Sequence, residues 1–341
     1  MQTDKVPIGY PFSDPLDLMG CAVASYDGDM SDKSDVREAL REGRRRPSSS
    51  EFEIREALRE GRRRSSPSVL EIHEAIRIEG EHELSRPVLA LIVSGLAAGL
   101  SMGFSFLAEA ALSSGLPDAA WSDLVSKLGY SVGFLIVILG RQQLFTENTL
   151  TPIIALFSQP SRASIFKLGR LWMVVLLANL TGAACFAAFL ALTPVVDQTM
   201  VEHLGKISLH VVDPTPLSIF LRGILGGWLI ALMVWLLPFA ETARPWVIII
   251  ITYLVGVGQL AHIIAGSVEV LYGVFIATIP FSQAFGGFML PALAGNVIGG
   301  VALVSMLHHA QVRFDQKPQN IKSKSKSKSA SWYTSELNTM N

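Results

Sequence analysis

Long apolar segments, separated by short polar breaks, fill the chain between residues 86 and 313. A helix needs about 20 predominantly apolar residues to cross the hydrocarbon core of a bilayer. The pattern therefore predicts an all-α membrane protein with six transmembrane helices. The predicted spans are residues 88–112, 128–158, 168–192, 217–237, 245–280 and 284–307.

Polar residues interrupt the second and the fifth of these spans. The breaks lie at residues 140–148 and 262–269, and a shorter apolar segment follows each one. Backbone inside a bilayer leaves the helical form only where protein or a water-lined cavity satisfies its N–H and C=O groups. Two breaks at similar depth therefore predict a polar path between them. The half-helix after each break would direct its positive N-terminus at the membrane centre, which suits an anion.

The two halves of this region look related. Each has a broken span followed by an Asn-x-x-Gly motif, and the spacing from Thr146 to the first asparagine nearly equals that from His262 to the second. Three spans in each half force the second half to enter the membrane from the opposite side, so we predict an inverted 3+3 repeat. Small residues would allow its helices to pack closely. The residues assigned to this packing are Asn179, Gly182, Asn296, Gly299 and Gly300.

The two ends of the chain are polar. Residues 1–67 contain an Arg-rich unit that recurs with a period of 18 residues, and residues 314–341 are basic and of low complexity. The repeat units have too few aliphatic residues to bury a shared core, so a disordered tail is predicted. Its arginines either bind anionic lipid headgroups or form a solvated tail without function. A degraded third copy, residues 68–85, is predicted to be an amphipathic interfacial helix. Its apolar face would consist of Leu70, Ala75, Ile76 and Ile78.

Composition and charge agree with a membrane protein. Of 341 residues, 50% are hydrophobic and 17% are charged, whereas about a quarter are charged in soluble proteins. Basic residues of the connecting loops gather on one side together with both tails, which predicts cytoplasmic termini in a cell (inner or plasma) membrane. Two cysteines support neither a disulfide framework nor a Cys-based metal site. We expect no cofactor, no metal, no nucleic-acid partner and no cleaved signal peptide.

His262 is the central candidate for chemistry. It stands at a helix break at membrane depth, where ionisable residues are usually functional. An imidazole there can give a proton to a small carboxylate or nitrite, and the neutral acid then crosses an apolar constriction that the anion cannot cross. Thr146, in the other break, would fix the tautomer or orientation of the ring. Leu144 and Phe145 would form the constriction.

Charged residues near the breaks allow two interpretations. Arg141 attracts anions, or it forms a structural ion pair with Glu147 or Glu269, because unpaired charges at this depth are costly. Both interpretations stay open. Arg222 and Glu109 are expected to cap or brace helix ends near the interfaces.

These motifs together resemble the formate/nitrite transporter family, most closely its YfdC-like branch. The order and spacing are kept over residues 86–313. The matching pieces are Leu144-Phe145-Thr146, Asn179-x-x-Gly182-Ala183, Arg222-Gly223-Ile224-Leu225, His262 and Gly295-Asn296-x-x-Gly299-Gly300. The resemblance implies an aquaporin-like six-helix protomer, a homopentamer with one pore in each protomer, and passage of small monovalent anions or their acids, such as formate or nitrite. It assigns Leu144 and Phe145 to the constriction and Thr146 to the partner of the central His262.

The sequence also departs from the family pattern. Charged and amide side chains surround the Leu-Phe-Thr element, and a lysine expected in the half-helix after the first break is absent. The resemblance therefore leaves the substrate open. Channel and proton-coupled transporter are equally compatible with these residues.

Three other functional classes were weighed. A neutral-solute pore of the aquaporin type should carry paired Asn-Pro-Ala elements, which this sequence lacks. An intramembrane enzyme would depend on Ser267 near His262, without the motifs that surround such pairs, so no enzyme is expected. A membrane scaffold with a vestigial pore would use the Arg-rich tail to recruit partners.

Overall fold

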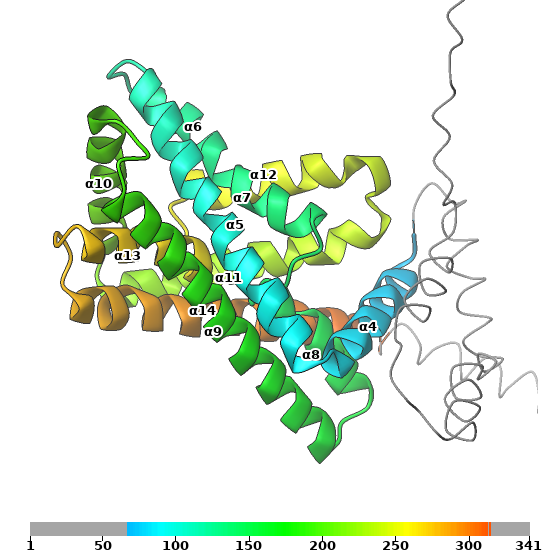
Figure 1. The fold of residues 1–341 in the computed structure, drawn as a ribbon. Coiled ribbons are helices and arrows are strands. Elements are labelled where there is room, and N and C mark those ends of the chain that lie inside the picture. The colour runs from blue at the N-terminus through cyan, green and yellow to red at the C-terminus, as the bar shows by residue number, and fades with distance from the viewer. Residues whose placement is uncertain (1–66, 313, 315–341) are drawn as a thin grey trace, which may run out of the picture. The chain divides into compact units, whose positions relative to one another are not determined.

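The computed structural model describes residues 67–312 and residue 314. They belong to the unit Ala57–Asn341, and the other unit, Met1–Glu56, lies outside the described part. The predicted Arg-rich repeats and the predicted basic tail from residue 315 onward also lie outside it. Every described element of secondary structure is a helix (Figure 1). Five described helices are long and apolar enough to cross a membrane: Val88–Gly115, Ser122–Leu139, Arg162–Leu192, Pro216–Phe239 and Gln283–Val312.

The element order follows the predicted alternation of long and broken helices. In chain order the first elements are α4 (Val69–Ser85), α5 (Val88–Gly115), α6 (Ser122–Ser126), η1 (Lys127–Gly129), α7 (Tyr130–Leu139), η2 (Glu147–Thr149), α8 (Thr151–Ser158), α9 (Arg162–Leu192) and α10 (Gln198–Val212). They continue with α11 (Pro216–Leu236), η3 (Leu237–Phe239), η4 (Glu241–Ala243), α12 (Arg244–Val257), α13 (Ile263–Phe275), η5 (Gln283–Met289), α14 (Leu290–Ile298) and η6 (Gly299–Met306).

Several helices begin at a residue whose side chain accepts a hydrogen bond from the first turn. Such a cap satisfies one of the backbone N–H groups that have no partner within the helix. At α4 the cap is reciprocal, because the side chain of Glu71 also accepts from the backbone N–H of Ser68, at 2.7 Å. The capping residues are Ser68, Ser161, Asp197, Thr215 and His262.

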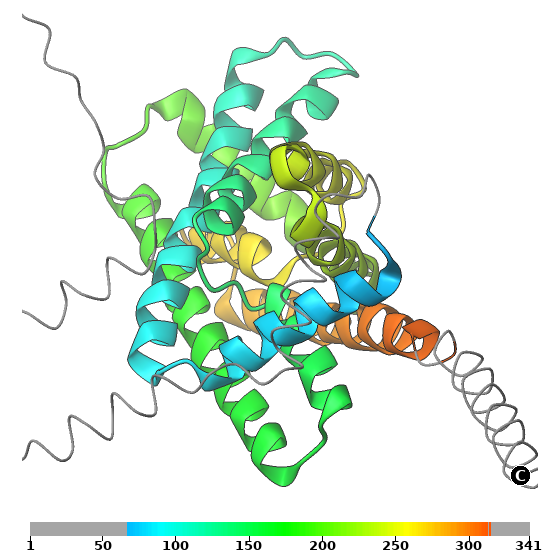
Figure 2. The same cartoon turned by 90° about the vertical axis from the view of Figure 1, so that its right-hand side faces the viewer.

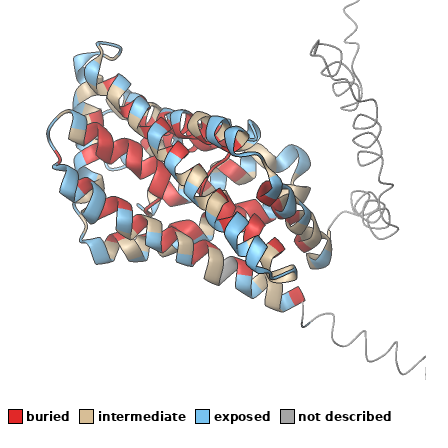
Figure 3. Cartoon of the chain, turned by 60° about the horizontal axis from the view of Figure 1, so that its bottom comes forward, coloured by how far each residue is buried: buried red, intermediate tan, exposed pale blue. Residues whose placement is uncertain are grey.

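Two pairs of long helices form the centre of the described unit. Helix α5 packs along α9, and α11 packs along α14 (Figures 1 and 2). Their backbones approach closely at glycines: a Cβ on Gly182 would lie 2.4 Å from the carbonyl oxygen of Leu96, and one on Gly299 would lie 2.1 Å from that of Ile224. Buried residues cover the faces that these helices turn toward one another, and exposed ones cover the outside (Figure 3).

The outward surface carries many large apolar side chains. Phe166 is 78% exposed, Leu89 72% and Trp246 67%. Such a surface would be unfavourable in water, and a lipid core or a neighbouring subunit covers it in membrane proteins.

Helix α4 buries only part of the apolar face predicted for it. Ile76 is buried together with His73 and Gly80, while Leu70 and Ile78 are 39% and 38% exposed. The reason is that α4 lies against α8 (Figure 2), so closely that a Cβ on Gly80 would overlap the backbone of Thr151. A small residue at the crossing point therefore decided which face is buried.

Two further predictions are corrected. The segment around His203 and His210, which connects the third and fourth predicted spans and would be expected to be a loop, is the helix α10. The break in the fifth span lies at residues 258–262, not 262–269, because His262 caps α13 and the residues from Ile263 onward are helical. Polar side chains inside α13, such as Ser267, had suggested a longer break.

Candidate functional site

The two broken helices end in the same type of turn. After α7 the chain passes through Gly140 to Arg141, and after α12 it passes through Gly258 to Gln259. Arg141 has a φ of 53° and Gln259 a φ of 49°, a left-handed conformation that costs free energy for residues other than glycine. Two non-glycine residues at matched positions in this conformation indicate that the surrounding packing imposes the turn.

One asparagine holds the extended backbone of each break. The side-chain oxygen of Asn179 accepts from the N–H of Phe145 at 2.9 Å, and its amide donates to the carbonyls of Gln143 and Gly95. In the second half, Asn296 accepts from the N–H of Ile263 at 2.8 Å. It likewise donates to two carbonyls, those of Ala261 and Gly223, each at 2.8 Å. Four of these bonds satisfy backbone groups of the two breaks, which lack helical partners, and the other two tie the asparagines to carbonyls of α5 and α11.

The matched turns also set the correspondence between the two breaks. Counted from Gly140 and Gly258, His262 corresponds to Leu144. The spacing of side chains in the sequence had instead placed Thr146 opposite His262. The side-chain spacing was misleading because it takes no account of the position of the left-handed turn, from which the two breaks must be counted.

The structure nevertheless brings Thr146 and His262 together. The hydroxyl oxygen of Thr146 lies 2.8 Å from Nε2 of His262, and both side chains are almost fully buried. The other ring nitrogen, Nδ1, accepts from the backbone N–H of Ala265 at 3.1 Å. A nitrogen that accepts carries no proton, so this geometry places the ring proton on Nε2, which donates to Thr146. The imidazole is thus neutral, and it is also the N-cap of α13.

Apolar side chains surround this pair. Leu144 is fully buried and Phe145 is 2% exposed. The Phe145 ring packs edge-on against Trp172, whose indole N–H donates to the carbonyl of Asn148 at 2.9 Å. The ring of Phe134 stands edge-on to His262 with its centroid 5.0 Å away. The imidazole and the threonine hydroxyl are therefore isolated polar groups in an otherwise apolar neighbourhood.

A cavity lies on each side of the pair. The histidine vestibule, of about 70 Å³, has His262 in its wall together with residues of α5, α7, α10, α11 and α13. The α4 vestibule, of about 320 Å³, is lined by Gln143, Glu147 and Asn148 together with Glu79 and other residues of α4. Leu144, Phe145 and Thr146 line neither cavity. Thr146 contacts His262, which lines the histidine vestibule, and the sequence neighbours Gln143 and Glu147 line the α4 vestibule.

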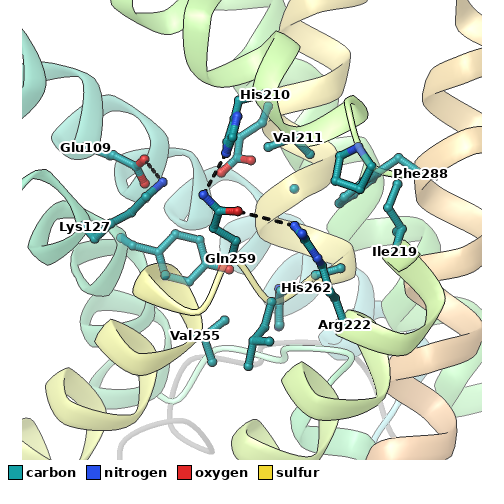
Figure 4. A pocket seen from close by; sticks show the side chains of 17 residues that line it. Glu109, Lys127, His210, Val211, Ile219, Arg222, Val255, Gln259, His262 and Phe288 are labelled. Atoms are coloured by element: carbon teal, nitrogen blue, oxygen red, sulfur yellow. Dashed lines mark hydrogen bonds and ion pairs between the residues drawn. The ribbon is translucent and has the colours of Figure 1, made fainter. Parts of the chain in front are cut away.

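Polar side chains cross the histidine vestibule (Figure 4). The guanidinium of Arg222 donates to the side-chain oxygen of Gln259 at 3.5 Å, and the amide of Gln259 lies 2.8 Å from Nε2 of His210. On the other wall, Lys127 forms an ion pair with Glu109. An outer cavity of about 910 Å³ shares Glu109, Lys127, His210 and Gln259 with this vestibule.

The ion pair predicted for Arg141 has a different partner in the structure. Arg141 pairs with Glu79 of α4 at 3.2 Å, and not with Glu147 or Glu269. Attraction of anions by Arg141 stays a prediction. Both partners are well exposed, so the pair contributes little to stability. Glu147 lines the α4 vestibule together with Arg141. Glu269 is not a loop residue; it lies within α13 and lines the histidine vestibule on the other side of the constriction.

Sequence analysis missed Lys127 and Gln259, and it assigned Glu109 only a bracing role. A lone lysine and a lone glutamate next to apolar spans were the available signals. Their pairing could not be read from the sequence because they lie on different helices. Among residues 67–312, no group of three or more His, Cys, Asp or Glu side chains is arranged to hold a metal ion.

Residues 70–310 match the family model described as "Formate/nitrite transporter". The chain belongs to the formate/nitrite transporter family. Its similarity to the inner membrane protein YfdC of Escherichia coli (strain K12) is 43% identity over 239 residues, or 70% of this chain and 77% of that protein. A probable formate transporter of Methanothermobacter thermautotrophicus is 26% identical over 65% of this chain and 88% of that protein.

Solved structures of this transporter family share the fold. A pentameric formate channel with formate bound aligns with a TM-score of 0.56 at 22% identity, covering 65% of this chain and 96% of that one. An FNT family ion channel aligns with a TM-score of 0.57 at 19% identity, covering 74% and 96%. This formate/nitrite transporter family member is therefore a multi-pass membrane channel or transporter, and the expectation that it is not an enzyme is confirmed.

Proposed function

We propose that this protein carries small monovalent anions, or their conjugate acids, through a pore that passes between the Thr146–His262 pair and the Leu144/Phe145 constriction. The observation that carries the proposal is one neutral imidazole, held by two hydrogen bonds, at the closed point between two vestibules. The formate transporter and formate channel relatives named above support this class of substrate.

The geometry supports a different role for each group of side chains along the path. Arg222 and Lys127 attract an anion into the histidine vestibule, where the N-terminus of α13 adds partial positive charge. The Nε2–H of His262 then offers a hydrogen bond, either to Thr146 or to the arriving solute. Leu144 and Phe145 strip water from the solute, which favours a neutral acid over its anion at this point.

The proton that neutralises the anion near His262 needs a source. A neutral imidazole whose Nδ1 accepts from Ala265 has only its Nε2 proton, and giving that proton away would leave an imidazolate. Protonation of Nδ1 would first break the cap of α13. We therefore propose that His262 orients and polarises the solute, while the transferred proton comes from another group or from vestibule water.

The assembly and topology belong to the same proposal. We infer an inverted 3+3 repeat, supported by the matched turns at Arg141 and Gln259 and by the matched hydrogen bonds of Asn179 and Asn296. The basic residues of the connecting loops support cytoplasmic termini. A homopentamer in the lipid bilayer, with one pore in each subunit, is supported by the pentameric structural neighbour and by the exposed apolar surface.

The test is solute flux into vesicles that contain the purified full-length protein. A panel of formate, nitrite, acetate and lactate is compared with the neutral solutes urea and glycerol, under an imposed pH gradient. We expect uptake of weak acids that rises with the gradient and little uptake of the neutral solutes. Equal uptake of neutral solutes, independent of pH and membrane potential, would instead support a pore of the aquaporin type.

Two substitutions at His262 separate transport from folding. His262→Ala removes both the ring and the cap, whereas His262→Asn retains a side-chain acceptor that can cap α13. We expect both variants to take up weak acids more slowly, because the ring that orients the solute is lost, and only the alanine variant to lose thermal stability as well. Wild-type rates of weak-acid uptake in the well-folded asparagine variant would remove His262 from the mechanism.

A further inference from the structure

A buried carboxylate without a partner lines the histidine vestibule. Glu269 lies in α13, seven residues beyond His262, so the two share a face of the helix about 10 Å apart along its axis. Glu269 is 5% exposed. Among the described residues, its carboxylate has neither a hydrogen-bond nor an ion-pair partner, although it faces the same cavity as His262.

The nearest charges are the members of the Glu109–Lys127 ion pair. Glu109 is 3% exposed and its ammonium partner 21%. Glu269 interacts electrostatically with both, attracted by Lys127 and repelled by Glu109. The vestibule wall thus combines two carboxylates with one ammonium group. We call Glu109, Lys127 and Glu269 the vestibule triad.

The charge balance of the triad determines how many protons it holds. An ionised carboxylate removed from water is costly unless a cation and hydrogen bonds compensate it. One lysine compensates one carboxylate, and two carboxylates that share a site do not both ionise readily. The uncompensated carboxyl group is therefore favoured in its neutral, protonated form.

Other groups also line this cavity, and Arg222 is a second cation among them. Helix α7 contributes Tyr130, α10 contributes His210, α11 contributes Arg222 and η5 contributes Phe288. Arg222 and His210 both contact the side chain of Gln259, and His210 also lies 3.5 Å from Asp213. The charges that act on Glu269 are those of Glu109 and Lys127, so Arg222 does not compensate its carboxylate. Asp123 adds a further negative charge near Lys127.

We propose that the vestibule triad stores one exchangeable proton, held mainly on Glu269, and that Glu269 protonates the substrate anion before it reaches the constriction. The transfer of the proton to a substrate rests on the proposed transport function, whereas the storage of the proton on the triad does not. In the transfer, the O–H bond of the Glu269 carboxylic acid breaks and an O–H bond on the substrate forms. Lys127 compensates the resulting carboxylate until it takes up a proton from water in the outer cavity, which Lys127 and Glu109 also line.

The proton store is tested without any transport assay. Infrared spectra of the purified full-length protein at neutral pH should contain the C=O stretching band of a buried carboxylic acid. Glu269→Gln should abolish this band, and so should Glu109→Gln, because one carboxylate then remains for one lysine. Lys127→Met should roughly double the band, because both carboxylates then lose their cation. The matched control Glu202→Gln, at an exposed position of α10, should leave it unchanged.

The three triad variants keep this test decisive if one of them fails to fold. A wild-type spectrum without the band, or a band that persists in Glu269→Gln and Glu109→Gln, would overturn the proton store. A smaller band in Lys127→Met would contradict the charge balance.

Flux measurements then test the transfer step. In vesicles, Glu269→Gln should reduce pH-driven formate accumulation about tenfold, while the matched control Glu202→Gln should accumulate formate like the wild type. Unchanged accumulation in Glu269→Gln would overturn the transfer role even where the infrared result holds. A wild-type protein that carries no weak acid would instead overturn the proposed function, and the infrared result would remain interpretable by itself.

Discussion

Asparagine side chains solve the main structural problem of the two broken helices. Where the chain leaves the helical form inside a bilayer, backbone N–H and C=O groups lose their hydrogen-bond partners, and each buried unsatisfied group costs about 1–3 kcal/mol. Asn179 and Asn296 each satisfy two such groups and also donate to a carbonyl of a neighbouring long helix, because an amide has both an acceptor and two donor hydrogens. They were predicted as packing residues, and their hydrogen bonds show what that packing achieves.

Replacing Asn296 by aspartate tests this at the residue scale. The acid keeps an acceptor for the N–H of Ile263, but it places a carboxylate oxygen against the carbonyls of Ala261 and Gly223. Two buried carbonyls lose their donor, so we expect a destabilisation of roughly 2–4 kcal/mol. The thermal unfolding midpoint of the purified protein in detergent should fall, together with solute flux.

Asn179→Asp should have the same effect as Asn296→Asp. Gln198→Glu, an exposed position at the start of α10, makes the same change from amide to acid and should have none. Equal midpoints for all three variants would contradict the assigned role of the asparagines.

At the scale of elements, the long helices touch through their backbones. The pairs α5/α9 and α11/α14 have glycines at their closest points, where Gly182 and Gly299 leave no room for a side chain. Close approach increases dispersion contacts, which help to hold helices together where lipid surrounds the outer faces. The positions are specific, because other glycines of the same helices face open space.

Gly299→Ala should therefore destabilise the protein despite the higher helix propensity of alanine. Its Cβ would lie 2.1 Å from the carbonyl oxygen of Ile224, and separating α11 from α14 should cost about 1–3 kcal/mol. The exposed Gly169 of α9 provides the control, since nothing lies within 4 Å of a Cβ there. Gly169→Ala should be neutral or stabilising by up to ~1 kcal/mol in the same thermal assay. A stabilising Gly299→Ala would show that the two helices can move apart freely.

The sequence was a good guide to elements that depend on local pattern and a poor one where tertiary contacts decide. Apolar length placed the long spans, and the breaks were found near their observed positions. The end of the second break was misplaced because a histidine that caps a helix looks the same in sequence as one inside a loop. The ion pair of Glu109 with Lys127 joins residues on separate elements, so no sequence periodicity reveals it.

At the scale of the whole described unit, the first described helix, α4, contacts the last one. Nε2 of His73 lies 3.2 Å from Nδ1 of His309 in the last helix, and its ring packs edge-on against Trp235 of α11. Burial, followed by the charge of the neighbouring His309, lowers the pKa of His73 from 6.5 to about 4. The packed ring is therefore neutral, and its packing links α4 to the core of the protein.

This contact should make stability depend on pH. The unfolded chain takes up a proton on His73 near pH 6.5, but the folded protein does so only near pH 4. Stability should therefore fall as the pH decreases from about 6.5 toward 4. We expect the unfolding midpoint of His73→Gln to fall less steeply over this range than that of the wild type. His82→Gln, an exposed histidine of the same helix, should follow the wild-type curve. Parallel curves for all three proteins would contradict a role for His73.

The asparagine hydrogen bonds also bear on how selective the passage can be. Both breaks are tied to neighbouring long helices immediately next to Leu144 and His262, so the narrowest point has no free hinge. We infer that, on the proposed path past Leu144 and His262, the width of this point is fixed when the chain folds and larger solutes are rejected. Replacing Leu144 or Phe145 by a smaller residue should give a variant that admits larger acids. Removing the asparagine hydrogen bonds should instead unfold the protein before the passage widens.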